Sequence, residues 1–129
     1  MAEIKRVVSG NVTVWKVIGH PKIEELVGKL REFYNGNLPR KVVWDLSEAS
    51  LGQLKFDDFE RLAEFMLKYA HTRAGGKAAI ISPNDLEYGF GRTVDLLATQ
   101  QKAPFETYTF RQPAEAAKWL GGKELPTVN

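Results

Sequence analysis

Val42-Val43-Trp44-Asp45-Leu46 reads as a β-strand that is buried on both of its faces. Its residues are apolar except near the C-terminal end, and continuous apolar runs are typical of strands inside parallel sheets. Parallel neighbours are joined by long crossover connections, which are usually helices. This stretch therefore predicts one helix before it and another after it.

Both expected helices have matching patterns in the sequence. Pro21 stands at a first-turn position, and apolar residues from Ile23 to Tyr34 then recur with helical spacing. A second pattern runs from about 56 to 70, and its core stripe is Phe56, Phe59, Leu62, Ala63, Met66 and Ala70. Phe65, Leu67 and Tyr69 lie off that stripe, so either neighbouring elements cover this second side or it is an exposed patch for a partner.

The alternation of strands and helices continues in both directions. Two β-rich runs, 4–8 and 12–18, flank Ser9-Gly10-Asn11 and predict an N-terminal hairpin. Further strands are predicted at 77–81 and 105–110. The helix between them has the stripe Leu86, Phe90, Val94, Leu97 and Ala98, and Pro113 opens a last helix. The sequence thus predicts an α/β fold with a mostly parallel sheet of about five strands and four helices. A single domain spans 1–122, and 123–129 is expected to be a frayed tail.

Composition narrows the function further. The 129 residues contain no cysteine, which excludes disulfides and thiolate chemistry and suits the cytoplasm. The 18 basic and 16 acidic residues are interleaved, so we expect no nucleic-acid partner, because such binders concentrate positive charge in one stripe. The N-terminus lacks the apolar segment of a signal peptide. No apolar run approaches the roughly 20 residues of a transmembrane helix.

Motifs for catalysis or metal binding are missing from the sequence. Its two histidines, His20 and His71, lie far apart, and neither has the adjacent partner that a general base needs. There is no G-x-S-x-G elbow and no G-x-x-x-x-G-K-[ST] phosphate loop. We therefore expect no catalytic residue, no metal and no cofactor. The enzymatic alternative is a small carboxylate-dependent enzyme that uses Asp45 and Asp85.

The functional surface is expected where the strands end, because ligands of α/β sheets bind beyond the C-terminal strand ends. The segments expected there are 45–50 and 82–92. In these segments the expected ligand-binding residues are Asp45, Ser47, Asp85, Tyr88, Phe90 and Arg92. Tyr88 and Phe90 would offer apolar contact, while Arg92 would hold an anionic group.

Two features of the 82–92 segment have two interpretations each. Gly89 and Gly91 weaken a helix, which indicates either close packing on the sheet or approach of a ligand to the backbone. Arg92 would either be a salt-bridge partner, for example of Asp45 or Asp85, or bind an anion.

Four short motifs follow one another in an order that indicates a protein family. They are Trp44-Asp45-Leu46-Ser47, Ser82-Pro83-Asn84-Asp85, Tyr88-Gly89-x-Gly91-Arg92, and Phe110-Arg111 followed by Ala114, Ala117, Trp119 and Leu120. From Ile4 to Leu120 the sequence resembles a STAS-type domain, and above all the SpoIIAA-like branch, which is grouped with the SEC14 lipid-binding fold. The resemblance implies a non-enzymatic binding or regulatory domain. Its partner would be a small apolar or lipid-like anionic ligand, or a protein.

One departure from that family concerns its phosphorylation switch. The anti-sigma-factor antagonists that this sequence resembles carry a phosphorylatable serine in an Asp-Ser-Ser/Gly-Gly stretch, and here Gln53-Leu54-Lys55-Phe56 stands in that place. Partner switching by phosphorylation is therefore the alternative function, with Ser47 or Ser50 as acceptor. A homodimer formed through the 56–70 helix is a further expectation.

Overall fold

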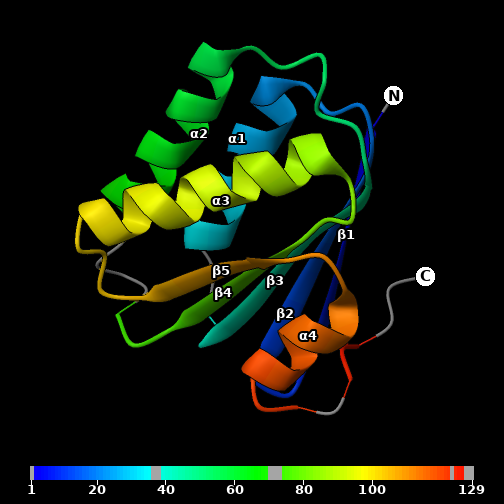
Figure 1. Ribbon diagram of the computed structural model, residues 1–129, viewed down its shortest axis with the longest axis vertical. Coiled ribbons are helices and arrows are strands. Elements are labelled where there is room, and N and C mark those ends of the chain that lie inside the picture. Colours follow the sequence, from blue (N-terminus) through cyan, green and yellow to red (C-terminus); the bar gives the residue numbers. More distant parts are fainter. Residues whose placement is uncertain (1, 36–38, 70–73, 123, 127–129) are drawn as a thin grey trace.

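Strands and helices alternate along the chain, as the sequence predicts (Figure 1). The computed structural model describes residues 2–35, 39–69, 74–122 and 124–126. Its elements are β1 (Ala2–Ser9), β2 (Val12–Gly19), α1 (Ile23–Asn35), β3 (Lys41–Ala49), α2 (Phe56–Lys68), β4 (Lys77–Ile81), α3 (Asp85–Gln100), β5 (Glu106–Phe110) and α4 (Pro113–Trp119). The strand order is β1-β2-β3-β4-β5, with β1 and β2 antiparallel and the other neighbours parallel. The predicted α/β fold with its N-terminal hairpin is confirmed.

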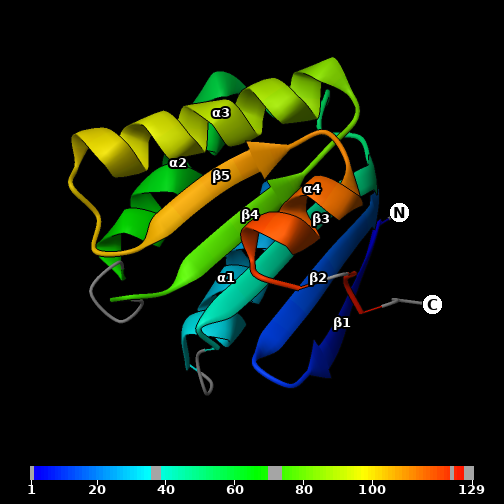
Figure 2. The same cartoon turned by 60° about the horizontal axis from the view of Figure 1, so that its bottom comes forward.

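Three helices cover one face of the sheet, and α4 covers the other (Figures 1 and 2). From β2 onward, each crossover connects one strand to its parallel neighbour, and the chain always moves across the sheet toward β5. Because such connections are right-handed, α1, α2 and α3 all lie on the same side. That side is called the helix face below, and the opposite side is called the α4 face. The sheet therefore separates two different surroundings.

An aromatic stack forms the middle of the helix face. Trp15 of β2 and Trp44 of β3 lie parallel, with ring centroids 5.6 Å apart and planes 16° apart. Phe33 of α1 meets both rings edge-on, at 6.4 Å from Trp15 and 5.5 Å from Trp44. Aromatic pairs in these arrangements bury large apolar areas and add specific ring contacts. This stack anchors α1 against the two central strands.

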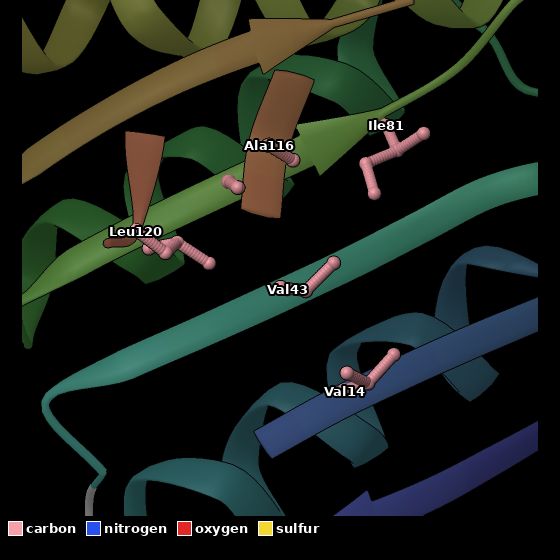
Figure 3. Packing of buried hydrophobic residues seen from close by; sticks show 6 residues of the cluster. Val14, Val43, Ile81, Ala116 and Leu120 are labelled. Atoms are coloured by element: carbon pink, nitrogen blue, oxygen red, sulfur yellow. The ribbon is translucent and has the colours of Figure 1, made fainter. Parts of the chain in front are cut away.

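The α4 face has a smaller core of aliphatic side chains. Val14, Val43 and Ile81 lie on neighbouring strands and pack with Ala116 of α4 and with Leu120, which directly follows that helix (Figure 3). Ala116 is fully buried, and its small side chain lets this short helix approach the sheet closely. This packing fixes α4 beside the outer strand β5.

The second apolar side of α2 is largely covered within the protein. The ring of Tyr34 on α1 lies 6.2 Å from Phe65 and 5.2 Å from Tyr69. Leu67 is half-buried. Of the two interpretations, cover by a neighbouring element therefore holds for Phe65 and Tyr69, while the homodimer stays a prediction. No helix within the described part of the chain is long and apolar enough to cross a membrane.

The predicted core stripes are wrong at two positions. Phe56 is 71% exposed and Leu86 is 50% exposed, because each stands at the first turn of its helix, beyond the edge of the sheet. In α3 the buried side is rotated relative to the prediction, and it consists of Glu87, Gly91, Val94, Asp95 and Ala98. Of the predicted helix and tail ends, residues 70, 123 and 127–129 lie outside the described residues.

Gly91 brings α3 close to the sheet. A Cβ atom at this position would lie 2.5 Å from Thr109 Oγ1 and 3.1 Å from Ile80 Cγ2. Gly89 has no atom within 4 Å of the corresponding position. Close packing therefore accounts for Gly91, and it does not account for Gly89.

Candidate functional site

Asp45 and Ser47 lie within a strand instead of beyond its end. β3 continues to Ala49, three residues beyond the predicted end at Leu46, so the prediction that Asp45 and Ser47 lie where the strand ends is wrong. Asp45 lies on the α4 face and its Oδ1 accepts a hydrogen bond from the Ser47 N–H at 2.9 Å. Ser47 is half-buried, and Ser50 is exposed just after the strand.

An ion pair between β2 and β3 lies beside Asp45. Lys16 Nζ forms an ion pair with the Glu48 carboxylate. The hydrogen bond to Glu48 raises the pKa of Lys16, and the charges of Glu48 and Asp45 act in the same direction, while burial opposes them. These contacts give Asp45 a cationic neighbour inside the sheet.

Asp85 and Tyr88 meet a residue that the sequence did not single out as a ligand-binding residue, Arg111. Arg111 Nη1 donates to Asp85 Oδ1 at 2.7 Å and to the Pro83 carbonyl at 3.0 Å. The Arg111 guanidinium lies 3.9 Å from the ring centroid of Tyr88. Asp45 and Asp85 therefore have different hydrogen-bond partners.

Arg92 is placed away from the carboxylates that the sequence proposed for it. Its Nη1 lies 3.8 Å from Asp95 Oδ2, so Arg92 forms a salt bridge as one interpretation predicted, but its partner is Asp95 and not the suggested Asp45 or Asp85. The guanidinium carbon of Arg92 lies 5.2 Å from the ring centroid of Tyr108 on β5. Arg92 thus stands at the outer edge of the sheet.

Phe90 lies on the helix face, apart from Tyr88 and Arg92. Its ring centroid is 4.8 Å from that of Phe59 on α2. Phe90 also lines an apolar cavity of about 70 Å³ between the sheet and the helices. The lining residues are Ile4, Val17, Leu26, Lys29, Leu30, Trp44, Leu46, Leu51, Leu62, Met66, Ile80, Phe90 and Val94. All of them except Lys29 are apolar.

The loop between β3 and α2 closes one end of this cavity. Leu51, which is 1% exposed, points into the cavity, and its N–H donates to Glu87 Oε2 at 3.2 Å. Gln53 Nε2 donates to the Pro21 carbonyl before α1 at 2.7 Å. The loop is therefore tied both to α3 and to the segment that precedes α1.

A groove lies on the α4 face along β5. It has a volume of about 340 Å³, and its lining residues are Tyr88, Tyr108, Thr109, Phe110, Arg111, Glu115 and Trp119. The rings of Tyr108, Phe110 and Trp119 contact one another, with centroid distances from 4.9 to 6.3 Å. The groove therefore contains aromatic side chains together with the charged groups of Arg111 and Glu115, whereas the lining of the cavity is almost wholly apolar.

A buried carboxyl group, Asp95, links α3 to β5. The Thr107 hydroxyl donates to Asp95 Oδ1 at 2.9 Å, while Asp95 Oδ2 and Thr109 Oγ1 are buried without a hydrogen-bond partner among the described residues. Burial raises the pKa of Asp95 above its usual range, although the neighbouring hydroxyls and the charge of Arg92 oppose this. A proton on the Asp95 carboxyl would let this buried group donate as well as accept, as the Thr109 hydroxyl already can.

Replacement of Asp95 by asparagine is expected to stabilise the protein at neutral pH. The folded state holds this proton to a higher pH than the unfolded state, so its stabilising contribution is complete below the unfolded pKa and is lost as pH rises through the folded pKa. The advantage of Asp95→Asn is about 1.4 kcal/mol for each unit by which folding raises the pKa. Urea unfolding at several pH values measures it.

An exposed carboxylate provides the control for that experiment. Glu64→Gln on α2 alters an exposed group and should change the free energy of unfolding little at any pH. If the difference between Asp95→Asn and the unmodified protein does not shrink toward acidic pH, ionisation of Asp95 is not its cause.

The remaining candidate residues are the histidines and the carboxylates that could hold a metal ion. Among residues 2–35, 39–69, 74–122 and 124–126, no three His, Asp or Glu side chains are grouped so that they could hold a metal ion. His20 is exposed, and His71 lies outside the described residues.

The arrangement of the chain was compared with those of known proteins. No protein-family model and no curated protein matches the sequence. The crystal structure of an uncharacterized protein of the DUF3478 family from Shewanella loihica PV-4, described as having a SpoIIAA-like fold, superposes with a TM-score of 0.59. The match covers 92% of this chain and 93% of that chain, at 16% sequence identity.

The chain has a SpoIIAA-like fold. At this level of identity the likeness establishes the fold alone. Within the SpoIIAA-like fold, the segment Gln53–Phe56 occupies the turn before α2 and the first residue of that helix. The Lys55 N–H there donates to Asp58 Oδ2 at 2.9 Å, which caps the helix.

Sequence reasoning missed most of the cavity and most of the groove, because the predicted site residues include only Phe90 from the first lining and only Tyr88 from the second. Lys29 and Met66 looked like parts of ordinary amphipathic helices, and nothing in their spacing marks a cavity. The groove did leave a signal, because Tyr108 and Phe110 alternate on β5 and Trp119 follows on the next helix. Two aromatic residues on one face of an outer strand could have identified it.

Proposed function

We propose that this protein is a binding module that takes a small apolar ligand with an anionic end into the cavity beneath its helices. The observation that carries the proposal is the lining, in which twelve apolar residues and one lysine surround the space. Binding sites of small molecules are typically concave and apolar, with few polar groups that orient the ligand. No catalytic step is part of the proposal.

The apolar lining of the cavity favours a hydrocarbon ligand. Trp44, Leu62 and Phe90 come from β3, α2 and α3, so the walls of the cavity belong to different elements. A void lined in this way stays dry, because water finds too few polar partners there. An apolar chain or ring that enters it gains dispersion contacts without displacing bound water.

The size of the cavity limits what binds without rearrangement. Its volume of about 70 Å³ is smaller than the roughly 150 Å³ of an engineered cavity that accepts benzene. A larger ligand therefore requires movement of lining side chains. Met66 is the best placed to move, because an unbranched thioether side chain adapts to irregular spaces.

Lys29 supplies the specificity for an anionic end. Its ammonium group lies 3.3 Å from Glu32 Oε2 on the same helix, and the side chain is 38% exposed. An exposed ion pair of this kind contributes little to stability, so a ligand carboxylate can replace Glu32 as partner at small cost. The long apolar stem of the lysine lines the cavity while the charge stays near water.

Partial filling of the cavity provides the test. Leu26→Phe adds bulk at a half-buried lining position, and it should weaken binding of a medium-chain fatty acid about tenfold. Leu96→Phe makes the same change at a position that is 57% exposed and does not line the cavity, so binding should be unchanged. Titration calorimetry with octanoate, and with octanol as the uncharged counterpart, gives both affinities.

Two results would contradict the proposal. The first is the absence of any thermal shift with fatty acids of increasing chain length, together with no ligand in an organic extract of the purified protein. The second is equal weakening by Leu26→Phe and Leu96→Phe, since only the first residue lines the cavity.

A further inference from the structure

The groove on the α4 face has an exposed aromatic floor. Tyr108 is 45% exposed, and its ring centroid lies 4.9 Å from that of Phe110 and 6.3 Å from that of Trp119. Trp119 and Phe110 are also packed against the core of the α4 face, which holds their rings in place. A rigid aromatic surface of this kind offers stacking to another flat ring.

Two arginine side chains lie near these rings: Arg111 lines the groove, and Arg92, which is not one of its lining residues, lies beside the groove against the Tyr108 ring. The Arg111 guanidinium already donates to Asp85 and to the Pro83 carbonyl. Arg92 lies over the Tyr108 ring and is 48% exposed, and its Nη1 lies at 3.8 Å from Asp95 Oδ2, beyond hydrogen-bond distance. The planar fork of an arginine binds a carboxylate or phosphate through two hydrogen bonds. Arg92 is therefore the cation best able to receive an anion.

We propose that this groove is a second binding site, which takes a flat aromatic ring bearing a carboxylate or a phosphate group. The ring stacks on Tyr108 and meets Trp119, whose plane is 42° from that of Tyr108, at its edge, and the anionic group binds Arg92 at the rim of the groove. The Glu115 carboxylate lines the same groove and accepts an N–H or O–H donor of the ring. The volume of about 340 Å³ falls within the range of small-molecule sites.

Two macromolecular occupants fit the groove less well. A peptide strand added to β5 needs free main-chain groups, but Thr109 in that strand is only 1% exposed. A second copy paired antiparallel along the whole of β5 would be centred on Tyr108. That arrangement brings the two Arg92 guanidinium groups together, and like charges disfavour it.

The second site is independent of the proposed cavity ligand. The groove lies on the α4 face, whereas the cavity lies on the helix face, and the two sets of lining residues share no member. Failure of one site to bind leaves the other site testable. Chemical shifts of backbone and indole N–H groups distinguish them by residue.

Titration followed by two-dimensional NMR tests the proposal. Naphthoate and adenosine monophosphate are the two probes, one for each anionic group. Binding of either should shift the N–H signals of Thr109, Arg111 and the Trp119 indole. Cyclohexanecarboxylate has the anion without the flat ring, and naphthalenemethanol has the ring without the anion. Each should bind at least about tenfold more weakly than naphthoate.

Two replacements at half-exposed positions complete the test. Arg92→Gln and Tyr108→Leu should each weaken binding about tenfold or more, and neither removes a buried side chain. Arg61→Gln on the exposed side of α2 is the matched control and should bind as the unmodified protein does. The proposal is overturned if neither probe binds, if cyclohexanecarboxylate binds as well as naphthoate, if Arg92→Gln binds normally, or if the shifts fall on Leu26 and Met66.

Discussion

Alanine at position 91 is expected to destabilise the protein by about 1–3 kcal/mol, which is the usual cost of extra bulk in a packed interior. The new methyl group would lie 2.5 Å from Thr109 Oγ1 and 2.6 Å from Thr109 Cγ2. Thr109 is β-branched and only 1% exposed, so its side chain has no room to turn away. Alanine gains about 1 kcal/mol in helix propensity over glycine, and the clash should exceed this gain.

The neighbouring glycine supplies a matched control in the same helix. Gly89→Ala meets no atom within 4 Å and is expected to stabilise the protein by up to about 1 kcal/mol through helix propensity alone. Urea unfolding followed by circular dichroism measures both variants. If Gly91→Ala is as stable as Gly89→Ala, then α3 does not pack on β5 as closely as described.

Leu62→Ala is expected to cost about 2–5 kcal/mol and to enlarge the cavity. Leu62 is 4% exposed and lines the cavity from α2, so the deleted atoms leave space that joins the existing void. A small apolar molecule such as benzene should then restore part of the lost stability, because it binds the folded state alone. Thermal unfolding with and without benzene measures the recovery.

Ile81→Ala is the control for that recovery. Ile81 is fully buried in the core of the α4 face and lines neither the cavity nor the groove, so its loss should be similarly costly. Benzene should restore less stability to this variant. Equal recovery in the two variants would show that the added ligand does not report on the cavity.

The order of elements was predictable because the physical signals were local. The run 42–46 required cover on two faces, the positive φ of Gly10 suited a hairpin turn, and Pro21 marked the approach to α1. Phe56 and Leu86 were misplaced because helical spacing shows which residues share a side, but not where the helix passes the edge of the sheet. Whether a first-turn residue is buried depends on tertiary placement.

The candidate site was less predictable because its parts come from different faces. Tyr88, Phe90 and Arg92 are close in the sequence and were expected to act together. α3 instead presents Phe90 to the cavity, while Tyr88 meets Arg111 and Arg92 meets Tyr108. The direction of each side chain depends on how α3 is rotated over the sheet. The close contact at Gly91 fixes that rotation. From the sequence alone, this glycine could be explained either by close packing on the sheet or by approach of a ligand.

The three tryptophans are distributed so that each side of the sheet carries its own optical reporter. Trp44 lines the cavity and stacks on the buried Trp15, while Trp119 lines the groove. Light emission from an indole responds to its immediate surroundings, so a change at the groove affects Trp119 first. Occupation of the cavity instead affects the stacked pair. The unmodified, unlabelled chain can therefore be followed by its intrinsic fluorescence at both places.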